Sequence, residues 1–299
     1  MEKTKVAIVG YGNIGRFSLE AVRAAADMEC VGVIRRSGSA EGIPELASCK
    51  VVSDIRELGK VDVAILAVPS RKVGETAQKY LRLGISTVDS FDIHTDICAL
   101  RSQLDPLARE NGAVSVISAG WDPGSDSVVR ALMQGLAPKG ISYTNFGHGR
   151  SMGHSVAAKS VEGVKDALSV TIPIGTGLHR RMVYVELEPG AELSKVSAAI
   201  KADPYFAHDD THVSAVDSVD ALNDMGHGVN LVRKGVSGAT HNQLLEFNMK
   251  INNPALTGQV LVMAARAAVR QRPGCYTMIE IPVIDYLEGN RETLISQLV

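Results

Sequence analysis

The sequence predicts an α/β fold in which a doubly wound parallel sheet is joined to a second, α+β domain. Short apolar runs rich in β-branched residues alternate with stretches of helical composition over residues 1–120. Three glycines, Gly10, Gly12 and Gly15, directly follow the first of these runs. From about residue 141 the pattern changes to strand-like segments with only short helical pieces between them, which indicates a separate domain built mainly from strands.

The first domain is predicted from five apolar runs of the kind that a buried parallel sheet requires. They occupy Lys5–Val9, Cys30–Ile34, Val61–Val68, Ile85–Asp89 and Ala113–Ser118. The intervening helices are expected over Asn13–Ala26, Arg71–Leu83 and Thr95–Asn111. Because ligands bind beyond the carboxyl ends of strands in such a sheet, the segments 67–70, 90–92 and 119–124 are the candidates for a binding site.

The glycine spacing G-x-G-x-x-G predicts a dinucleotide site of the Rossmann type. Gly10 permits a tight turn, Gly12 lets the backbone approach a pyrophosphate, and Gly15 lets the following helix pack closely on the strand. The N-terminus of that helix supplies the anion site. Cofactor contacts are therefore expected from the turn itself, which consists of Gly10, Tyr11, Gly12, Asn13, Ile14 and Gly15.

Two arginines predict that the dinucleotide is NADP. Arg35 and Arg36 follow the second predicted strand, where a NAD-binding fold places an acid that accepts from the ribose 2′-hydroxyl. Two guanidiniums there would instead hold a 2′-phosphate through charge-assisted hydrogen bonds worth about 1.5–3 kcal/mol each. Ser37 and Ser39 would add neutral donors in the same loop. The alternative interpretation is a solvated basic corner.

The second domain is predicted from strand-like segments. Several of them alternate apolar and polar residues, as Met182–Glu188 does, which favours an antiparallel sheet with one side in solvent. The segments are Tyr143–Phe146, Val170–Ile174, Arg181–Leu187, Thr211–Val219, Val229–Val236 and Leu244–Ile251. The strongly apolar helix expected over Thr257–Gln271 is predicted to return to the first domain. The predicted domains are therefore 1–120 with 254–299, and 121–253.

Composition indicates a small-molecule partner. Lys and Arg number 31 against 33 Asp and Glu, and this balance gives no reason to expect nucleic acid or an anionic membrane as a partner. The apolar run that follows Lys5 is too short for a signal peptide or a membrane span, so a cytoplasmic location is expected. The 4 cysteines form no C-x-x-C pair and are interpreted as small core residues.

Several motifs resemble those of the meso-diaminopimelate D-dehydrogenase family. They are VAIVGYGNIGR at 6–16, VDSFD at 88–92, AGWDPG at 119–124, GHGRSMGHS at 147–155 and HNQLLEFNMKINNPALTGQVL at 241–261. The resemblance covers essentially the whole chain and implies a dimeric, cytosolic, NADP-dependent enzyme. Such an enzyme oxidatively deaminates the D-centre of meso-2,6-diaminopimelate to give L-2-amino-6-oxopimelate, ammonia and NADPH. The reverse reaction fixes ammonia toward lysine and peptidoglycan precursors.

The chain is shorter than the longer members of that family. The difference is expected in the second domain, between the strands near Arg181 and His227. A shortened region there would open the pocket and relax specificity toward simpler 2-oxo acids.

Residues after the first-domain strands are expected to surround the nicotinamide. Asp92 and Asp122 would hold the reacting amine, or each would cap the helix that follows it. Trp121, the only tryptophan, would wall the substrate slot, with a core position as the alternative. The remaining cofactor contacts are expected from Arg35, Arg36, Ser37, Ala67, Val68, Pro69, Ser70, Ser90, Phe91, Asp92, Trp121, Asp122, Pro123, Gly124 and Ser125.

The second domain is expected to hold the rest of the substrate. Phe146 precedes a glycine-rich loop whose backbone N–H groups would meet a carboxylate, and Met152 and Gly153 match the family's substrate loop. The resemblance assigns the non-reacting end of the substrate to Thr171, Arg181, His227 and Asn253. Arg181 would clamp the distal carboxylate, whereas its alternative is an exposed basic pair with Arg180.

Hydride can leave the D-carbon only after the ammonium has lost a proton, so the reaction needs a base of near-neutral pKa. The candidates are His154, in the expected loop, and Asp92 or Asp122, and the sequence does not choose among them. The run His208–His212 superficially resembles a metal site, but it lies at a loop-to-strand transition. Hydride chemistry on an amine needs no Lewis acid, so no metal is expected.

Other functions share the same first domain. An NADPH-dependent reductase, a D-amino acid dehydrogenase of broader range and a sugar dehydrogenase are the alternatives within the enzymes. A non-catalytic NADPH sensor that signals through its second domain is the alternative from another class. Turnover of an amino or oxo acid separates the enzymes from the sensor.

Overall fold

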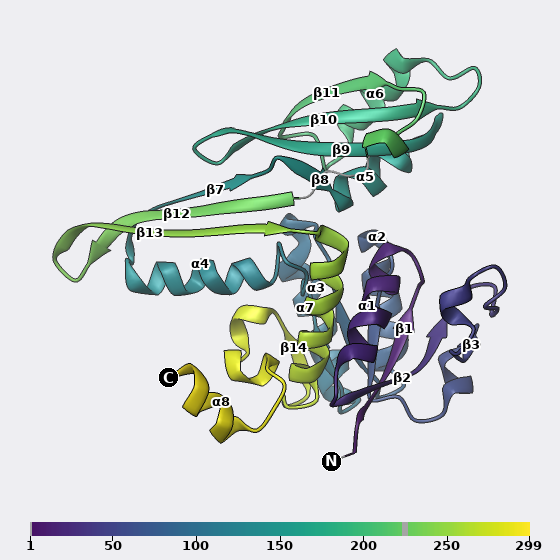
Figure 1. Ribbon diagram of the computed structural model, residues 1–299, viewed down its shortest axis with the longest axis vertical. Coiled ribbons are helices and arrows are strands. Elements are labelled where there is room, and N and C mark those ends of the chain that lie inside the picture. Colours follow the sequence, from purple (N-terminus) through teal and green to yellow (C-terminus); the bar gives the residue numbers. More distant parts are fainter. Residues whose placement is uncertain (1, 223–226) are drawn as a thin grey trace. The chain divides into compact units, whose positions relative to one another are not determined.

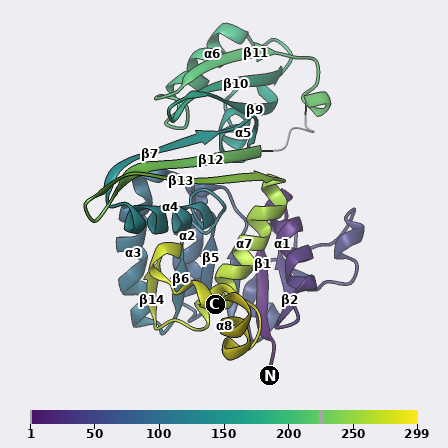
Figure 2. The same cartoon turned by 60° about the vertical axis from the view of Figure 1, so that its left-hand side comes forward.

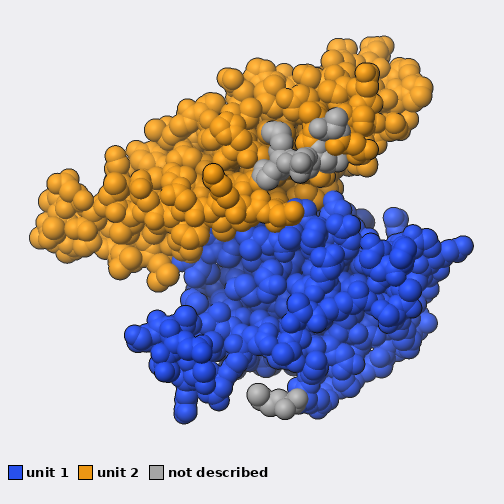
Figure 3. All heavy atoms as spheres, in the orientation of Figure 1, with its two compact units in different colours: residues 1–128, 254–299 blue, residues 129–253 orange. Residues whose placement is uncertain are grey.

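The computed structural model describes residues 2–222 and 227–299. The chain forms two compact units, residues 1–128 with 254–299 and residues 129–253 (Figure 3). The division falls within helix α4 (Ser125–Leu136) and at the first residue of helix α7 (Asn253–Ala268), whereas the sequence-based boundary after residue 120 precedes α4. Within the described ranges, no helix has both the length and the apolar character that a membrane crossing requires.

The first unit is built on a 7-stranded sheet in the order β14-β6-β5-β4-β1-β2-β3. Strands β14, β1, β2 and β3 of this sheet are labelled in Figure 1. Its strands are β1 (Thr4–Val9), β2 (Met28–Ile34), β3 (Val51–Val52), β4 (Val63–Leu66), β5 (Ser86–Asp89), β6 (Val114–Val116) and β14 (Gly274–Tyr276). All neighbouring strands in it pair in parallel. The winding reverses between β1 and β4, so the predicted doubly wound parallel sheet is confirmed.

Helices cover both faces of this sheet (Figure 2). On one face, α1 (Asn13–Ala24) and α7 pack against the strands, and Val22 and Val260 join Val6 in one core. On the other face, α2 (Ser70–Leu81) and α3 (Ile97–Glu110) do the same, and Leu104 joins Ala7 in a second core. Because Val6 and Ala7 are neighbours with no exposed surface, the strand has to be apolar without interruption.

The predicted strands and helices of this unit are confirmed, although β4 and β6 are shorter than their apolar runs. Two edge strands, β3 and β14, were not predicted. A strand of two or three residues leaves no periodic pattern, so neither could be recognised in the sequence. The segment after α7 supplies β14, which pairs Gly274 with Val114, so the predicted return to the first domain adds a strand as well as a helix.

The second unit contains two sheets, of 4 strands in the order β11-β10-β9-β8 and of 3 strands in the order β13-β12-β7. The strands are β7 (Lys139–Phe146), β8 (Gly149–Ser151), β9 (Val164–Gly175), β10 (Leu178–Leu187), β11 (Asp210–Ala215), β12 (His227–Ser237) and β13 (Thr240–Ile251). Helix α5 (Met152–Lys159) lies between β8 and β9 in the chain. It buries Ala157 and Ala158 in a core with Val183 and Phe206.

The antiparallel sheet expected from alternating segments such as Met182–Glu188 is present, but it includes one parallel pair. Strands β10 and β11 pair in parallel, whereas β9 is antiparallel to both β8 and β10. Helix α6 (Leu193–Ala202) connects β10 to β11 as a crossover. A parallel neighbour requires such a connection, and the alternation of residues along a strand does not reveal the direction of its partner.

The four cysteines do not share one environment. Cys275 is buried, Cys30 and Cys49 are half-buried, and Cys98 is exposed on α3. The expectation of four core cysteines is therefore wrong for Cys98. Burial raises the pKa of the Cys275 thiol to about 12 and that of Cys30 to about 11, so both stay protonated at neutral pH.

Replacing Gly258 with alanine should loosen the contact between α7 and α1. A Cβ at Gly258 would lie 2.8 Å from the carbonyl carbon of Phe17 and 2.8 Å from the nitrogen of Ser18. Since backbone atoms cannot swing aside, we expect a loss of about 1–3 kcal/mol in the free energy of unfolding, measured in urea. Gly135 in α4 is the control, because its Cβ would meet nothing within 4 Å and helix propensity favours alanine. Equal effects of the two substitutions would contradict this packing argument.

Candidate functional site

The turn between β1 and α1 depends on glycine at two positions. Gly10 has a φ of +91°, and a Cβ there would lie 2.4 Å from the carbonyl oxygen of Ala67. A Cβ at Gly15 would lie 2.3 Å from the carbonyl oxygen of Gly10. The start of α1, the end of β1 and the end of β4 therefore meet at backbone distance.

Gly12 differs from the other two glycines because the space beside it is open. A Cβ at Gly12 would meet nothing within 4 Å, and the residue is exposed. Gly12 is the N-cap of α1, it receives no side-chain cap, and the first turn carries no acid. The first N–H groups of α1 are thus available to an anion, and the open backbone fits the pyrophosphate of a dinucleotide.

The two arginines after β2 differ in their surroundings. The half-buried Arg35 guanidinium donates through Nη1 to the carbonyl oxygen of Ser39 and so closes its own loop. The Ser37 hydroxyl lies 3.5 Å from the same carbonyl oxygen. Arg36 is exposed. Arg36 is therefore the guanidinium that a phosphate reaches without disturbing the loop.

The carboxyl ends of β4 and β5 are joined through Asp92. Helix α2 begins at Ser70, whose hydroxyl donates to Oδ1 of Asp92 at 2.5 Å. The N-cap of α3 is Asp96, so the alternative in which Asp92 caps that helix is not what the structure has. Asp92 is half-buried and follows the carboxyl end of β5.

Asp89, the last residue of β5, bonds to the loops that follow β5 and β6. Its Oδ1 accepts from the backbone N–H of Phe91 at 2.9 Å and of Ser118 at 3.1 Å. Burial raises the pKa of Asp89 to about 6, although these two hydrogen bonds act in the opposite direction. The sequence analysis did not single out Asp89, and the only indication was an acid at the end of an apolar run.

The segment after β6 forms a compact turn that begins α4. The N–H of Gly120 donates to Pro123, and the N–H of Asp126 donates to Trp121. A Cβ at Gly124 would lie 1.9 Å from the carbonyl oxygen of Gly120, so this turn also requires glycine. Trp121 is buried with 6% of its surface exposed, and Asp122 is half-buried.

In the second unit, Arg181 stands in a network of polar side chains. Across β9 and β10, Arg181 pairs with Thr171, and its Nη1 donates to the Thr171 hydroxyl. Its Nε donates to Oδ2 of Asp209 at 2.6 Å. The Arg181 side chain is 11% exposed, whereas that of Arg180 is 45% exposed and pairs with Asp210. The alternative of an exposed basic pair therefore describes Arg180 but not Arg181.

His154 belongs to the same network. Its Nδ1 lies 2.8 Å from the Ser151 hydroxyl, and its Nε2 lies 3.8 Å from Oδ2 of Asp209. Tyr205 and Phe206 pack edge-on against its ring. The expectation that Met152, Gly153 and His154 lie in a loop is wrong, because all three belong to α5, where they form the first turn.

Phe146 and His227 lie at the same end of the second unit. Their rings are stacked with centroids 6.4 Å apart, and the Phe146 N–H donates to Nε2 of His179 at 2.8 Å. A Cβ at Gly147 would lie 2.4 Å from the carbonyl oxygen of Thr171, so this strand end reaches the Arg181 network. Asn253, which is 8% exposed, lies with Nδ2 3.5 Å from the carbonyl oxygen of Arg150.

Sequence reasoning missed Asp209, which belongs to the Arg181 network, and His179, which accepts from the N–H of Phe146. Asp209 lies in the run His208–His212, which was considered only as a metal site. Among the described residues, no cluster of three or more His, Cys, Asp or Glu could hold a metal ion. The available indication was that Asp209 directly precedes the strand Asp210–Ala215. This strand pairs with β10, which carries Arg181.

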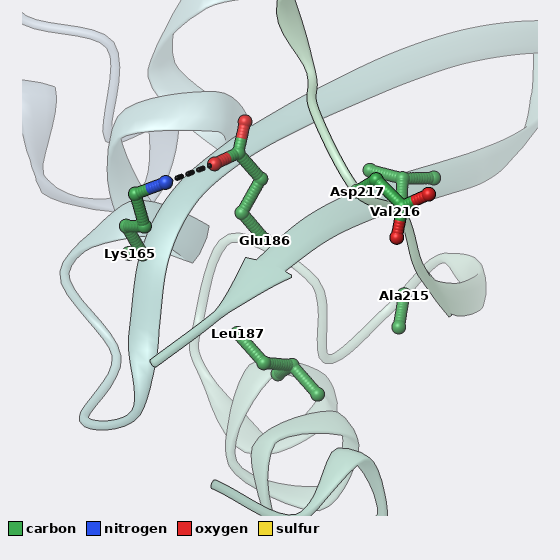
Figure 4. Close-up of a pocket in the computed structure, with 6 residues that line it drawn as sticks. All are labelled: Lys165, Glu186, Leu187, Ala215, Val216 and Asp217. Carbon is green, nitrogen blue, oxygen red and sulfur yellow. Dashed lines mark hydrogen bonds and ion pairs between the residues drawn. The ribbon is translucent and has the colours of Figure 1, made fainter. Parts of the chain in front are cut away.

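A pocket in the second unit lies apart from these residues. It has a volume of about 370 Å³ and is lined by Lys165, Glu186, Leu187, Ala215, Val216 and Asp217. Two of these residues, Lys165 and Glu186, form an ion pair of 2.9 Å (Figure 4). None of the predicted site residues lines this pocket, so we do not assign it to the reaction.

Comparisons with known proteins show the family of the chain. Residues 4–88 match the family model described as "Oxidoreductase family, NAD-binding Rossmann fold", and residues 120–180 match "Diaminopimelic acid dehydrogenase C-terminal domain". The chain is 63% identical over 299 residues to a meso-diaminopimelate D-dehydrogenase of Bacteroides fragilis, with 100% of both chains covered. The chain belongs to the meso-diaminopimelate D-dehydrogenase family.

Solved structures of two proteins resemble the chain over its whole length. The diaminopimelate dehydrogenase of C. glutamicum, in complex with diaminopimelate, is 28% identical with a TM-score of 0.89, and 100% of both chains is covered. An engineered D-amino acid dehydrogenase bound to NADP+ is 27% identical with a TM-score of 0.88, and 99% of this chain and 100% of that one are covered. The family and the fold together make the chain an oxidoreductase of the CH–NH₂ type.

Replacing Asp89 with asparagine should remove a pH dependence of stability. The pKa of Asp89 rises from 3.8 to about 6 on folding, so the folded chain binds the proton more tightly and stability falls as pH rises through this interval. A shift of this size corresponds to about 3 kcal/mol. The free energy of unfolding of Asp89→Asn, relative to the wild type, should thus improve by about 2 kcal/mol between pH 4 and pH 8 in urea denaturation, because part of the effect already falls below pH 4. An unchanged difference at the two pH values would show that burial does not perturb Asp89.

Proposed function

We propose that this chain is an NADP-dependent dehydrogenase that oxidatively deaminates the D-centre of meso-2,6-diaminopimelate. The products would be ammonia and L-2-amino-6-oxopimelate, which cyclises to tetrahydrodipicolinate, and the reverse reaction would serve lysine biosynthesis. The similarity to a meso-diaminopimelate D-dehydrogenase over the full length of both chains carries the proposal. The pairing of Arg181 with Thr171 supports it, because a substrate with a carboxylate at each end needs a cation for the end that does not react.

The first unit would bind the cofactor. The N–H groups at the start of α1 would hold the pyrophosphate of NADP, which the open backbone at Gly12 would admit, and Arg36 would hold the 2′-phosphate. When bound, NADP supplies the carbon that accepts the hydride. Asp92 and Asp122, which follow β5 and β6, would bind the reacting amine as carboxylates.

We assign the removal of the substrate proton to Asp92 or Asp122 rather than to His154. His154 shares Asp209 with Arg181, which would hold the end of the substrate that does not react. A base is useful only within hydrogen-bond reach of the proton that it removes. With the distal end clamped, only the D-centre would be presented to the cofactor, which accounts for stereoselectivity.

We further propose that the active form is a homodimer, as the family resemblance implies. The second unit carries large apolar side chains that are about half exposed or more, among them Leu132, Leu136, Ile141, Leu178 and Leu244. Exposed apolar side chains of this kind favour association with a second copy of the chain, which would bury them. A cytoplasmic location remains part of this proposal. Sedimentation of the purified chain as a monomer at micromolar concentration would overturn the dimer.

The experiment that tests the proposed function measures NADPH formation by absorbance with purified protein, NADP and meso-diaminopimelate. The LL and DD isomers, D-alanine and NAD are the parallel controls. We expect turnover with the meso isomer and NADP, and far weaker turnover with the LL isomer or with NAD. Turnover spread over many D-amino acids would favour a broad D-amino acid dehydrogenase, the activity named for the engineered structure. Tight NADP binding without any turnover would favour the sensor.

Replacing Arg36 with alanine should weaken binding of NADP but not of NAD, because only NADP carries the 2′-phosphate. The loss of one charge-assisted hydrogen bond predicts a dissociation constant for NADP about tenfold or more higher, measured by fluorescence titration. Arg56→Ala is the control, since Arg56 is an exposed arginine of the same unit that pairs with Asp54. An equal loss for both dinucleotides would place the 2′-phosphate elsewhere.

A further inference from the structure

The guanidinium of Arg181, which would bind the distal carboxylate of the substrate, also donates to the carboxylate of Asp209. Asp209 accepts from Nε of Arg181 at 2.6 Å, while the Thr171 hydroxyl accepts from Nη1. An arginine has five N–H donors in a fixed plane, so two anchors on different nitrogens fix both the position and the orientation of that plane. The remaining donors of Arg181 are thereby directed before a ligand arrives.

Asp209 is itself fixed by its surroundings. Its N–H donates to the carbonyl oxygen of Phe206 at 3.0 Å, and its carbonyl oxygen accepts from the Thr211 hydroxyl at 3.3 Å. Its Oδ2 also lies 3.8 Å from Nε2 of His154. The Asp209 side chain is 23% exposed, so it stands between the interior and solvent.

We propose that Asp209 is a positioning residue for recognition of the distal carboxylate, acting through Arg181. This inference rests on the proposed function, because it takes Arg181 as the group that binds the non-reacting end of the substrate. Without Asp209, the long Arg181 side chain would populate several rotamers, and binding would have to order it again. The cost would fall on substrates that carry a distal carboxylate and on no others.

Two effects of the Asp209 carboxylate oppose each other, and they can be separated. The negative charge of Asp209 lowers the positive potential that Arg181 presents to the substrate, whereas the carboxylate oxygen that accepts from Nε orients the guanidinium. Asp209→Asn removes the charge but keeps an acceptor oxygen, and Asp209→Ala removes both. If orientation dominates, as we propose, the asparagine variant stays close to the wild type and the alanine variant does not.

The experiment compares steady-state kinetics of the wild type, Asp209→Ala, Asp209→Asn and Asp210→Ala with NADP and three substrates. Meso-diaminopimelate carries a distal carboxylate and ammonium, D-2-aminopimelate carries only the carboxylate, and D-norleucine carries neither. A substrate that is turned over too slowly is measured as a competitive inhibitor of meso-diaminopimelate. Asp210 is the matched control, because it is the neighbouring acid and it binds the exposed Arg180 and His212.

We expect Asp209→Ala to raise KM about tenfold or more for meso-diaminopimelate and D-2-aminopimelate, as expected for weakening a charge-assisted contact, with kcat nearly unchanged. The constants for D-norleucine should stay as in the wild type. Asp209→Asn should lie within about threefold of the wild type on all three substrates, which is well below the factor for one lost charge-assisted bond. Asp210→Ala should leave all constants unchanged.

Three results would overturn the inference. Equal losses on all three substrates would mean that Asp209 only supports the fold. A loss confined to meso-diaminopimelate would mean that Asp209 binds the distal ammonium itself, and equal effects of the alanine and asparagine variants would assign the role to charge.

If Asp209→Ala does not fold, as judged by thermal unfolding, Asp209→Ser takes its place because the hydroxyl of the shorter serine side chain cannot reach Nε of Arg181. Absence of turnover of meso-diaminopimelate by the wild type would overturn the proposed function before any variant is measured.

Discussion

The nucleotide-binding end of the first unit depends on a place where three backbone segments meet with no side chain between them. The space for a Cβ at Gly15 is taken by the carbonyl oxygen of Gly10, and that at Gly10 is taken by Ala67. Any larger residue at either position would move the N-terminus of α1 away from the ends of β1 and β4. Gly12, in the same turn, is under no such steric limit. The motif therefore combines two glycines that the fold requires with one whose open face suits a ligand.

Around this contact, side chains join the loops at the carboxyl edge of the sheet. Asp89 accepts from the N–H groups of Phe91 and Ser118, and Ser70 donates to Asp92. Within the described residues, the buried Oδ2 of Asp89 receives no hydrogen bond, and burial raises the pKa of this carboxyl. A group that is costly to ionise is kept there because its other oxygen sets the geometry of two loops at once. Loops fixed in this way are better suited to hold reacting groups in register than freely moving ones.

The sequence predicted those parts of the molecule in which one residue pattern has one structural meaning. Strands buried on both faces must be uninterrupted apolar runs, so the first sheet could be read directly, whereas β3 and β14 were too short to leave a pattern. The glycine turn could be read from its spacing alone. The first turn of α5 was missed because Met152 and Gly153 follow a glycine-rich stretch. Asp209 was missed because its role comes from the approach of a neighbouring strand, which local sequence does not encode.

The two ion pairs between β10 and the start of β11 illustrate how strand geometry gives the same residue types different tasks. Neighbouring residues of a strand point to opposite faces, so Arg180 meets Asp210 at the surface while Arg181 turns inward to Asp209. An exposed pair adds little to stability, because solvent screens it and ordering two long side chains has an entropic cost. The inner pair is largely removed from water, and replacing such a pair by apolar residues often costs no stability. We therefore attribute to the inner pair the orientation of the Arg181 guanidinium rather than a contribution to folding, and the parallel direction of β11 brings an acid to that point.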